Sequence, residues 1–214
     1  MSVDQPFLHL ASSSPRRRDI LTAMGVPFSH AGVDIDETPV SGEAVADMVQ
    51  RVTHAKALAS EQSGNFTIPI LAADTAVALG KRIFGKPESK EQALEMLASL
   101  SGHVHEVLTA VVLLAGGQLH ATTSVTQVTF REIHPDEALA YWQSGEPQGK
   151  AGAYAIQGRG GIFVTSLSGS YSGVVGLPVF ETAGLLQEVG INVLSGEISP
   201  NNSRVPVPKR GNGR

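Results

Sequence analysis

The residue types best suited to chemistry gather near the start of the chain, where three serines, a proline and three arginines occupy positions 12–18. The apolar run Phe7–Leu10 before them predicts a short strand, and apolar spacing up to Met24 predicts a helix directly after them. Ser14 suits the N-cap of this helix and Pro15 its first position. Because helix starts favour anions, serine hydroxyls and guanidinium groups there predict a phosphate site. The alternative is a capped helix whose arginines are solvated.

Carboxylates at two further places suggest a cation site and a general base. Asp74 follows the apolar run 68–73, which predicts a buried strand, and a carboxylate there can bind a divalent cation or orient a water. An acidic loop at positions 34–37 includes Asp36 and Glu37, and Mg²⁺ prefers carboxylates together with waters and substrate phosphate. The alternatives are an Asx-turn or helix cap at Asp74 and a solvated loop at 34–37.

Two lysines and one glycine-rich string complete the candidate site. Lys56 lies on an expected long helix and Lys86 follows a glycine, and each offers a point charge for phosphate. The alternative for both is an ordinary surface lysine. The string Lys150–Gly158 is rich in small residues that let the backbone approach a ligand, and its Gln157 can donate to and accept from a base edge. The alternative is a tightly packed turn.

Other functions are disfavoured by composition and by missing motifs. The 214 residues carry a formal charge of −4, which argues against non-specific binding of nucleic acid, so any basic site must be local. The chain has no cysteine, which excludes disulfides and thiolate metal sites. We expect no secretory signal and no membrane span, hence a cytoplasmic protein. No Walker A loop or Gly-x-Ser-x-Gly elbow occurs, and His103 and His105 fit structural roles better than ligand roles.

Alternating periodicities predict an α/β fold with a mixed sheet. We expect helices at 15–24, 43–63, 89–100, 135–144 and 178–189, and strands at 28–35, 68–73, 105–115, 119–133 and 162–167. A short hairpin is expected around Gly80, and Ser89 begins a capping box. Residues 1–195 are expected to form one catalytic domain. From Gly196 onward few apolar residues remain, which predicts a disordered tail at 196–214.

Taken together, the motifs resemble the Maf family of nucleoside triphosphate pyrophosphatases. The matching strings are Leu10–Arg17, Ile35–Glu37, Ala55–Ala57, Ala73–Thr75, Gly85–Pro87, Leu100–His105 with Val107 and Thr109, Lys150–Tyr154 with Gln157 and Gly158, and Gly169–Tyr171 through Val175–Pro178. Each string alone is weakly specific, whereas the ordered set is highly specific. Two departures are visible, since Gly149 stands where many relatives have Asp and Ala155 where many have Gly.

The resemblance implies an elongated fold like that of inosine triphosphate pyrophosphatases, with two lobes around a cleft and often a homodimer. It implies cleavage between the α and β phosphates with a divalent cation, Mg²⁺ or Mn²⁺, and the subgroup resembles the one acting on dTTP and UTP. It assigns the proton acceptor to Asp74, metal binding to Glu37, Asp36 and Asp74, substrate binding to Ser12, Arg16, Arg17, Lys56 and Lys86, and base specificity to Arg16, Thr75 and Gln157. The alternatives are a 7-methyl-GTP pyrophosphatase and a non-catalytic nucleotide sensor that regulates cell division.

Overall fold

The structure is a computed structural model that describes residues 6–64, 66–195 and 197–198. The strands are β1 (Leu8–Ala11), β2 (Phe28–Ala31), β3 (Ile70–Leu79), β4 (Arg82–Phe84), β5 (Val104–Ala115), β6 (Gln118–Phe130), β7 (Val164–Ser168), β8 (Ile191–Asn192) and β9 (Glu197–Ile198). The α-helices are α1 (Pro15–Ala23), α2 (Val45–Ser63), α3 (Lys90–Leu100), α4 (Pro135–Gln143), α5 (Tyr171–Val175) and α6 (Val179–Glu188). Two short 3₁₀ helices are η1 (Ala151–Ala153) and η2 (Arg159–Phe163).

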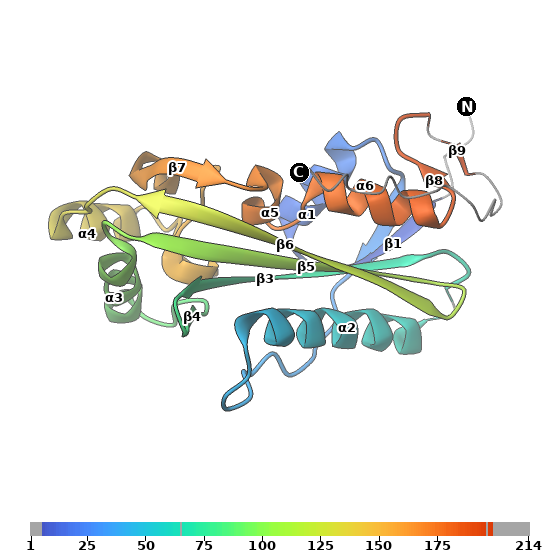
Figure 1. Cartoon of the computed structure of the whole chain (residues 1–214), viewed down its shortest axis with the longest axis horizontal. Coiled ribbons are helices and arrows are strands. Elements are labelled where there is room, and N and C mark those ends of the chain that lie inside the picture. Colours follow the sequence, from blue (N-terminus) through green and yellow to red (C-terminus); the bar gives the residue numbers. More distant parts are fainter. Residues whose placement is uncertain (1–5, 65, 196, 199–214) are drawn as a thin grey trace, which may run out of the picture.

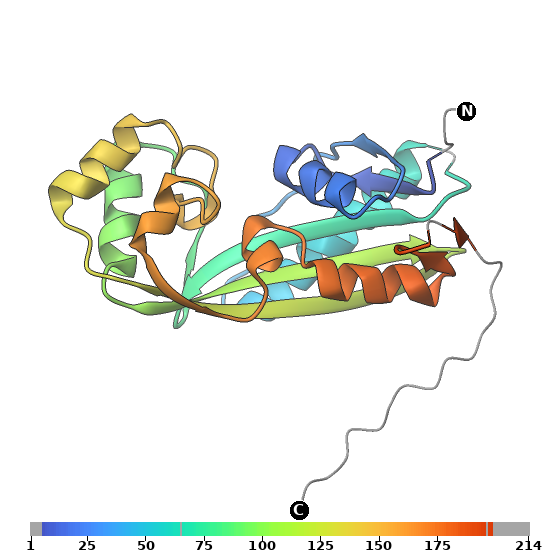
Figure 2. The same ribbon diagram turned by 90° about the horizontal axis from the view of Figure 1, so that it is seen from above.

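The centre of the molecule is a mixed seven-stranded sheet with the order β2-β1-β3-β5-β6-β7, in which β4 also pairs with β3. The neighbours β2, β1 and β3 run parallel, whereas β3, β5, β6 and β7 pair antiparallel. Because β3, β5 and β6 are long, they run through the whole elongated molecule and join two lobes (Figures 1 and 2). The expected α/β class, with an elongated mixed sheet and flanking helices, is confirmed.

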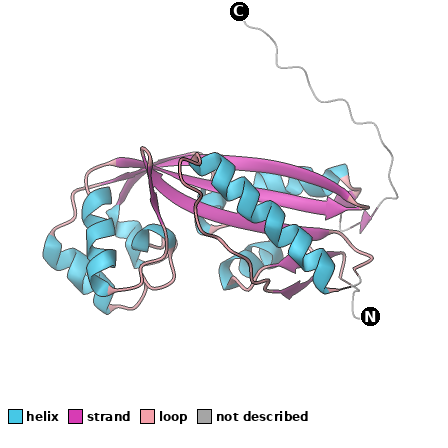
Figure 3. Cartoon of the chain, turned by 90° about the horizontal axis from the view of Figure 1, so that it is seen from below, coloured by secondary structure: helices cyan, strands magenta, loops and turns pink. Residues whose placement is uncertain are grey.

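The large lobe surrounds one end of the long strands. Helix α2 lies across one face of the sheet and buries Val49 and Val52 against small residues of β3 and β5 (Figure 3). On the opposite face α1 and α6 bury Leu21 and Leu186 against β1, β3 and β5 (Figure 1). Burial of such side chains stabilises each helix by roughly 1.5–3 kcal/mol per side chain, which fixes α1 and α2 on either side of β3.

The small lobe is built on the other end of the long strands by α3, α4, β4, η1 and η2 (Figure 2). Its core centres on the buried rings of Phe84, Phe130 and Phe163. His105 is buried there with its Nε2 2.9 Å from the Tyr154 hydroxyl, and its ring packs edge-on against Phe130. This environment supports the structural reading of His105.

Several element boundaries differ from the sequence expectations for local reasons. The capping serine Ser89 accepts from the Gln92 backbone as expected, whereas Ser14 occupies the N-cap of α1 without a side-chain cap bond. Strand β2 ends at Ala31 instead of residue 35. Strand β7 begins at Val164 instead of residue 162, because the residues before Val164 form the 3₁₀ helix η2.

The expected C-terminal tail lies mostly outside the described residues, at 196 and 199–214. Residues 197–198 form β9, which pairs with β8, so at these two positions the chain is a strand rather than a disordered tail.

Glu137 provides a pH-dependent contribution to the small lobe. Its carboxylate accepts from the Arg131 guanidinium at 2.8 and 2.9 Å and from the His134 backbone at 3.0 Å. The hydrogen bonds from Arg131 are the main reason why the pKa of Glu137 falls from 4.5 to about 2. A lowered carboxylate pKa stabilises the fold above pH 4.5, and this stabilisation is lost as the pH falls towards about 2.

We therefore expect Glu137→Gln to be less stable than the unaltered protein at pH 6, by a deficit that vanishes as the pH approaches 2. Urea unfolding of both proteins across this range measures the difference. A deficit that stays constant with pH would contradict the assignment.

Candidate active site

A cavity of about 380 Å³ lies between the two lobes, and its volume is typical of small-molecule sites. The large lobe contributes Ala11–Arg17, Glu37 and Lys56, and the small lobe contributes Lys86 and residues 148–151 and 154–157. Five cationic and two anionic side chains line it. The local positive balance on an acidic chain is the arrangement expected for an anionic ligand.

The cavity lies where β3 has no neighbouring strand on one side among the residues that the structure describes. Strand β3 pairs with β1 only through Ile70 and Leu71, and with β4 only through Val77–Leu79. The residues between these two pairings therefore have an unpaired edge, and Asp74 and Thr75 line the cavity there.

The expectation that Asp74 follows a strand is wrong, because Asp74 lies inside β3, opposite Ala110 of β5. The strand continues because pairing with β5 satisfies its backbone along the whole length, which overrides the low strand propensity of Asp. Neighbouring strand residues point to opposite faces, so Asp74 meets α2 while Thr75 meets the α5 side.

Lys56 joins the two candidate carboxylates. Its Nζ lies 2.7 Å from Asp74 Oδ1 and 2.6 Å from Glu37 Oε1, and the lysine is 8% exposed. Burial by itself would raise the pKa of Glu37, but the hydrogen bond and charge of Lys56, with Lys86 and Arg17 nearby, lower it below its usual value. Glu37 is therefore an anion at neutral pH beside Asp74.

Asp36 stands apart from this pair. Its Oδ1 accepts from the Thr38 backbone at 2.9 Å in an Asx-type turn, its side chain is exposed, and it does not line the cavity. The structure thus brings Glu37 and Asp74 together and leaves Asp36 outside. The solvated-loop interpretation describes Asp36.

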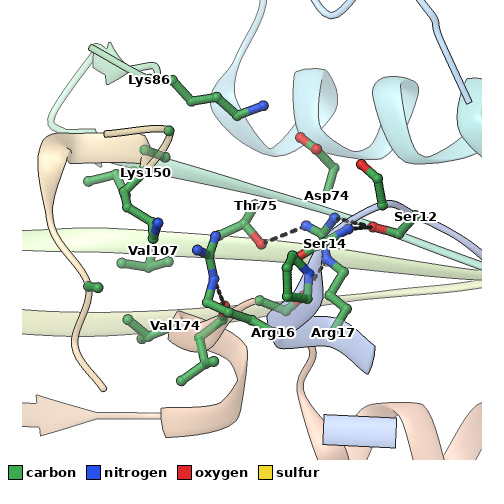
Figure 4. Close-up of a pocket in the computed structure, with 18 of the residues that line it drawn as sticks. Ser12, Ser14, Arg16, Arg17, Asp74, Thr75, Lys86, Val107, Lys150 and Val174 are labelled. Carbon is green, nitrogen blue, oxygen red and sulfur yellow. Dashed lines mark hydrogen bonds between the residues drawn. The ribbon is translucent and has the colours of Figure 1, made fainter. Parts of the chain in front are cut away.

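Arg17 connects the serine loop to the residues after α5. Its Nε donates to the Gly176 carbonyl at 2.8 Å, its Nη1 to Ser12 Oγ at 3.3 Å and its Nη2 to Thr75 Oγ1 at 3.3 Å (Figure 4). Thr109 donates to the Gly173 carbonyl at 2.8 Å, so in the 2.9 Å pair with Thr109 it is Thr75 that donates. The Thr75 hydroxyl hydrogen is thus already used within the protein.

Arg16 contrasts with Arg17. Within the described part of the chain its guanidinium makes one hydrogen bond, from Nε to the Val175 carbonyl at 3.2 Å, and both Nη groups are left for a ligand (Figure 4). Burial lowers the pKa of Arg16, which nevertheless remains a cation. Ser12 Oγ accepts from the Ser14 backbone at 3.2 Å as well as from Arg17, so its hydroxyl hydrogen is free to donate.

The remaining expected residues also reach the cavity. Lys86 extends its ammonium group into it on the side of Asp74 (Figure 4). Gln157 lines it from the small lobe and is exposed. The tight-packing alternative for 150–158 holds in part, since Gly152 has a φ of +68° and a Cβ there would lie 3.0 Å from Val77.

A divalent cation fits part of the expected ligand set. Within the described residues, no three His, Asp or Glu side chains lie together as a metal cluster. Mg²⁺ needs only one or two carboxylates when waters and phosphate oxygens complete its shell. Glu37 and Asp74, which share one ammonium partner, meet that requirement, whereas Asp36 does not.

Sequence reasoning missed Tyr141 and Glu146 and gave no role to Thr109, although all three belong to the hydrogen-bond network around the cavity. Thr109 holds Thr75, and the other two hold the segment that carries Gln157. Their signal is weak, because each is a single polar residue within an otherwise ordinary element.

Comparison with known proteins gives a consistent set of relatives. A family model described as Maf-like protein matches residues 7–189. A protein of Methylococcus capsulatus named dTTP/UTP pyrophosphatase is 50% identical over 191 residues, which cover 89% of this chain and 95% of that protein. Proteins of the same name from Nitrosomonas europaea and Myxococcus xanthus are 49% and 48% identical, over 87% and 89% of this chain and 96% of each relative.

Two solved structures show weaker likeness. They are a nucleoside-triphosphatase, dITP/XTP pyrophosphatase, from Mycobacterium abscessus and the Ham1 protein of Staphylococcus aureus. Both are 14% identical over 57% of this chain, covering 72% and 71% of those chains, with TM-scores of 0.36 and 0.39. Scores at this level support no conclusion about the site.

Proposed function

The chain belongs to the Maf-like protein family, and on this premise we propose that it hydrolyses dTTP and UTP to the nucleoside monophosphate and pyrophosphate. The observation that carries the proposal is the cavity, which serines and arginines of residues 12–17 line together with a carboxylate pair held by one lysine. The names of the relatives support the choice of substrate, and the regions of similarity cover most of this chain and of each relative.

In this mechanism the protein positions the triphosphate and neutralises its charge, as is usual in phosphoryl chemistry. Arg16, Ser12 and Lys86 bind phosphate oxygens, while Arg17 holds the serine loop in shape and adds positive charge. The water oxygen bonds to the α phosphorus, and a proton of the water passes to Asp74. The bond between the α phosphorus and the bridging oxygen is the one that breaks, so the bridging oxygen stays with the leaving pyrophosphate.

Glu37 and Asp74 are the residues that would hold a divalent cation, Mg²⁺ or Mn²⁺. When bound, the cation neutralises charge on the phosphate oxygens. Lys56 keeps both carboxylates oriented towards the same point, which supports this assignment.

None of the described helices is long and apolar enough to cross a bilayer. We extend the proposal to a homodimer, which light scattering after gel filtration would measure, and to a cytoplasmic location, where nucleoside triphosphates are found.

We expect kcat/KM for dTTP and UTP to exceed that for CTP, GTP and 7-methyl-GTP by roughly a hundredfold. Gln157 offers both a donor and an acceptor to the pyrimidine edge, and a base with another donor and acceptor pattern cannot make both hydrogen bonds. Pyrophosphate release with Mg²⁺ or Mn²⁺ across this nucleotide panel measures the preference.

Preference for 7-methyl-GTP would place the chain with the alternative substrate and contradict the role of Gln157. Binding of nucleotides without any pyrophosphate release would favour the sensor instead.

A further inference from the structure

The side chain proposed to face the base, Gln157, lies on a short turn of the small lobe. The Gly158 backbone N–H donates to the Ala155 carbonyl at 3.1 Å, which closes a turn with Ile156 and Gln157 at its centre. Both central residues line the cavity. The position of the Gln157 amide therefore depends on how this turn is held.

Glu146, in the loop after α4, holds the two residues that directly follow the turn. Its Oε2 accepts from the Arg159 backbone at 2.9 Å, and its Oε1 accepts from the Gly160 backbone at 3.0 Å and from the Tyr141 hydroxyl at 2.7 Å. Three donors thus converge on one carboxylate.

Tyr141 holds the beginning of the same turn. Its hydroxyl oxygen accepts from the Ala155 backbone N–H at 3.1 Å while it donates to Glu146. The ring is buried and packs edge-on against Phe163, with the ring centroids 5.2 Å apart. Because Tyr141 sits in the lobe core, it ties the turn to a rigid part of the molecule.

The fit between the turn and this pair is close. A Cβ at Gly160 would lie 2.5 Å from the Tyr141 hydroxyl, and a Cβ at Gly158 would overlap the Glu146 carboxylate. Burial raises the pKa of Tyr141, and backbone hydrogen bonds hold the pKa of Glu146 below its usual value despite burial. The phenol therefore remains a donor and the carboxylate an acceptor.

We propose that Tyr141 and Glu146 form a clamp that sets the position of Gln157 and thereby determines discrimination between nucleotide bases. Neither residue lines the cavity, so both are positioning residues that act through the turn. The inference rests on the proposed function, in which Gln157 meets the base.

The test compares Tyr141→Phe and Glu146→Gln with the unaltered protein. Tyr141→Phe leaves the Ala155 N–H without its acceptor. In Glu146→Gln, the side-chain NH₂ replaces one of the two oxygens that accept from backbone N–H groups, so two donors face each other. We expect the ratio of kcat/KM for dTTP over CTP to fall about tenfold in each variant, through KM for dTTP, with kcat little changed.

A double-mutant cycle with Gln157→Ala separates positioning from general damage. If the clamp acts through Gln157, Tyr141→Phe should change the base ratio little further once Gln157 is removed. Additive effects, or an equal loss of kcat/KM for every triphosphate, would overturn the proposal.

Glu137→Gln is the matched control, since Glu137 also accepts three hydrogen bonds in the small lobe but from Arg131 and His134 instead of the turn. It should lower stability and leave the base ratio unchanged. A changed ratio in this control would show that any damage to the lobe alters specificity, which overturns the clamp.

Two further measurements keep the clamp separate from the proposed function. Absence of pyrophosphate release by the unaltered protein would reject that function alone. In that case hydrogen exchange of the 155–160 amides in Tyr141→Phe, together with affinities for the α,β-methylene analogues of dTTP and CTP, tests the clamp. Faster exchange with a narrower affinity ratio supports it, and unchanged exchange or an unchanged ratio overturns it.

Discussion

Replacing Asp74 by Asn is expected to lower kcat for pyrophosphate release by about 10²–10⁴-fold while the protein still binds nucleotide. The amide has the same shape and its oxygen can still accept from Lys56, which lies 2.7 Å from the present carboxylate. It cannot take a proton from water at neutral pH. Initial rates of pyrophosphate release, with nucleotide affinities from calorimetry, measure the two effects separately.

Asp36→Asn is the matched control for this substitution. Asp36 is a carboxylate of the same type, only one residue from Glu37 in sequence, but its side chain is exposed and outside the cavity. We expect turnover within about threefold of the unaltered protein, in keeping with the small effects of most surface substitutions. Near-normal turnover in a folded Asp74→Asn variant would remove Asp74 from the role of base.

Replacing Arg16 by Ala is expected to weaken triphosphate binding roughly ten- to hundredfold, because charge-assisted hydrogen bonds to phosphate are among the stronger ones. Both Nη groups lack a partner within the described residues, so their loss removes little from the fold itself. Calorimetric titration with the α,β-methylene analogue of dTTP measures the loss. Thymidine affinity should change far less.

Arg17→Ala provides the comparison, since each nitrogen position of Arg17 donates to the protein, at Gly176, Ser12 and Thr75. Its removal should lower the melting temperature clearly, whereas Arg16→Ala should leave it nearly unchanged. Equal losses of thymidine and triphosphate affinity in Arg16→Ala would show that Arg16 holds the base or the fold instead of the phosphates.

Local features of the fold could be predicted from the sequence because the interacting groups are neighbours along the chain. The spacing of apolar residues located α1 to α4, α6, β5 and β6, although it ended β3 before Asp74 and gave no sign of α5. Ser89 caps α3 through a backbone group three residues away. The prediction of an anion site at the serine and arginine loop rests on the same kind of closeness, since a strand end and a helix start adjoin there. The composition predicted that any basic site must be local.

Other features depend on contacts between distant segments, which local patterns do not encode. Lys56 meets Asp74 because α2 packs across β3. Asp36 lies outside the cavity, in a turn in which its carboxylate accepts a hydrogen bond from the Thr38 backbone. Arg16 and Arg17 likewise differ in their contacts only because residues 175 and 176 pack against α1, where each accepts a hydrogen bond from one of the two arginines.

Both the sequence and the tertiary structure therefore determine the candidate site. The sequence by itself determined which residue types were present and which local elements carry them. Only the tertiary structure decided that Asp74 lies at an unpaired stretch of β3, and that Glu146 and Tyr141 hold the turn bearing Gln157. The physical reason is that sheet pairing and side-chain packing across tens of residues set these positions, whereas caps, turns and periodicity act within a few residues.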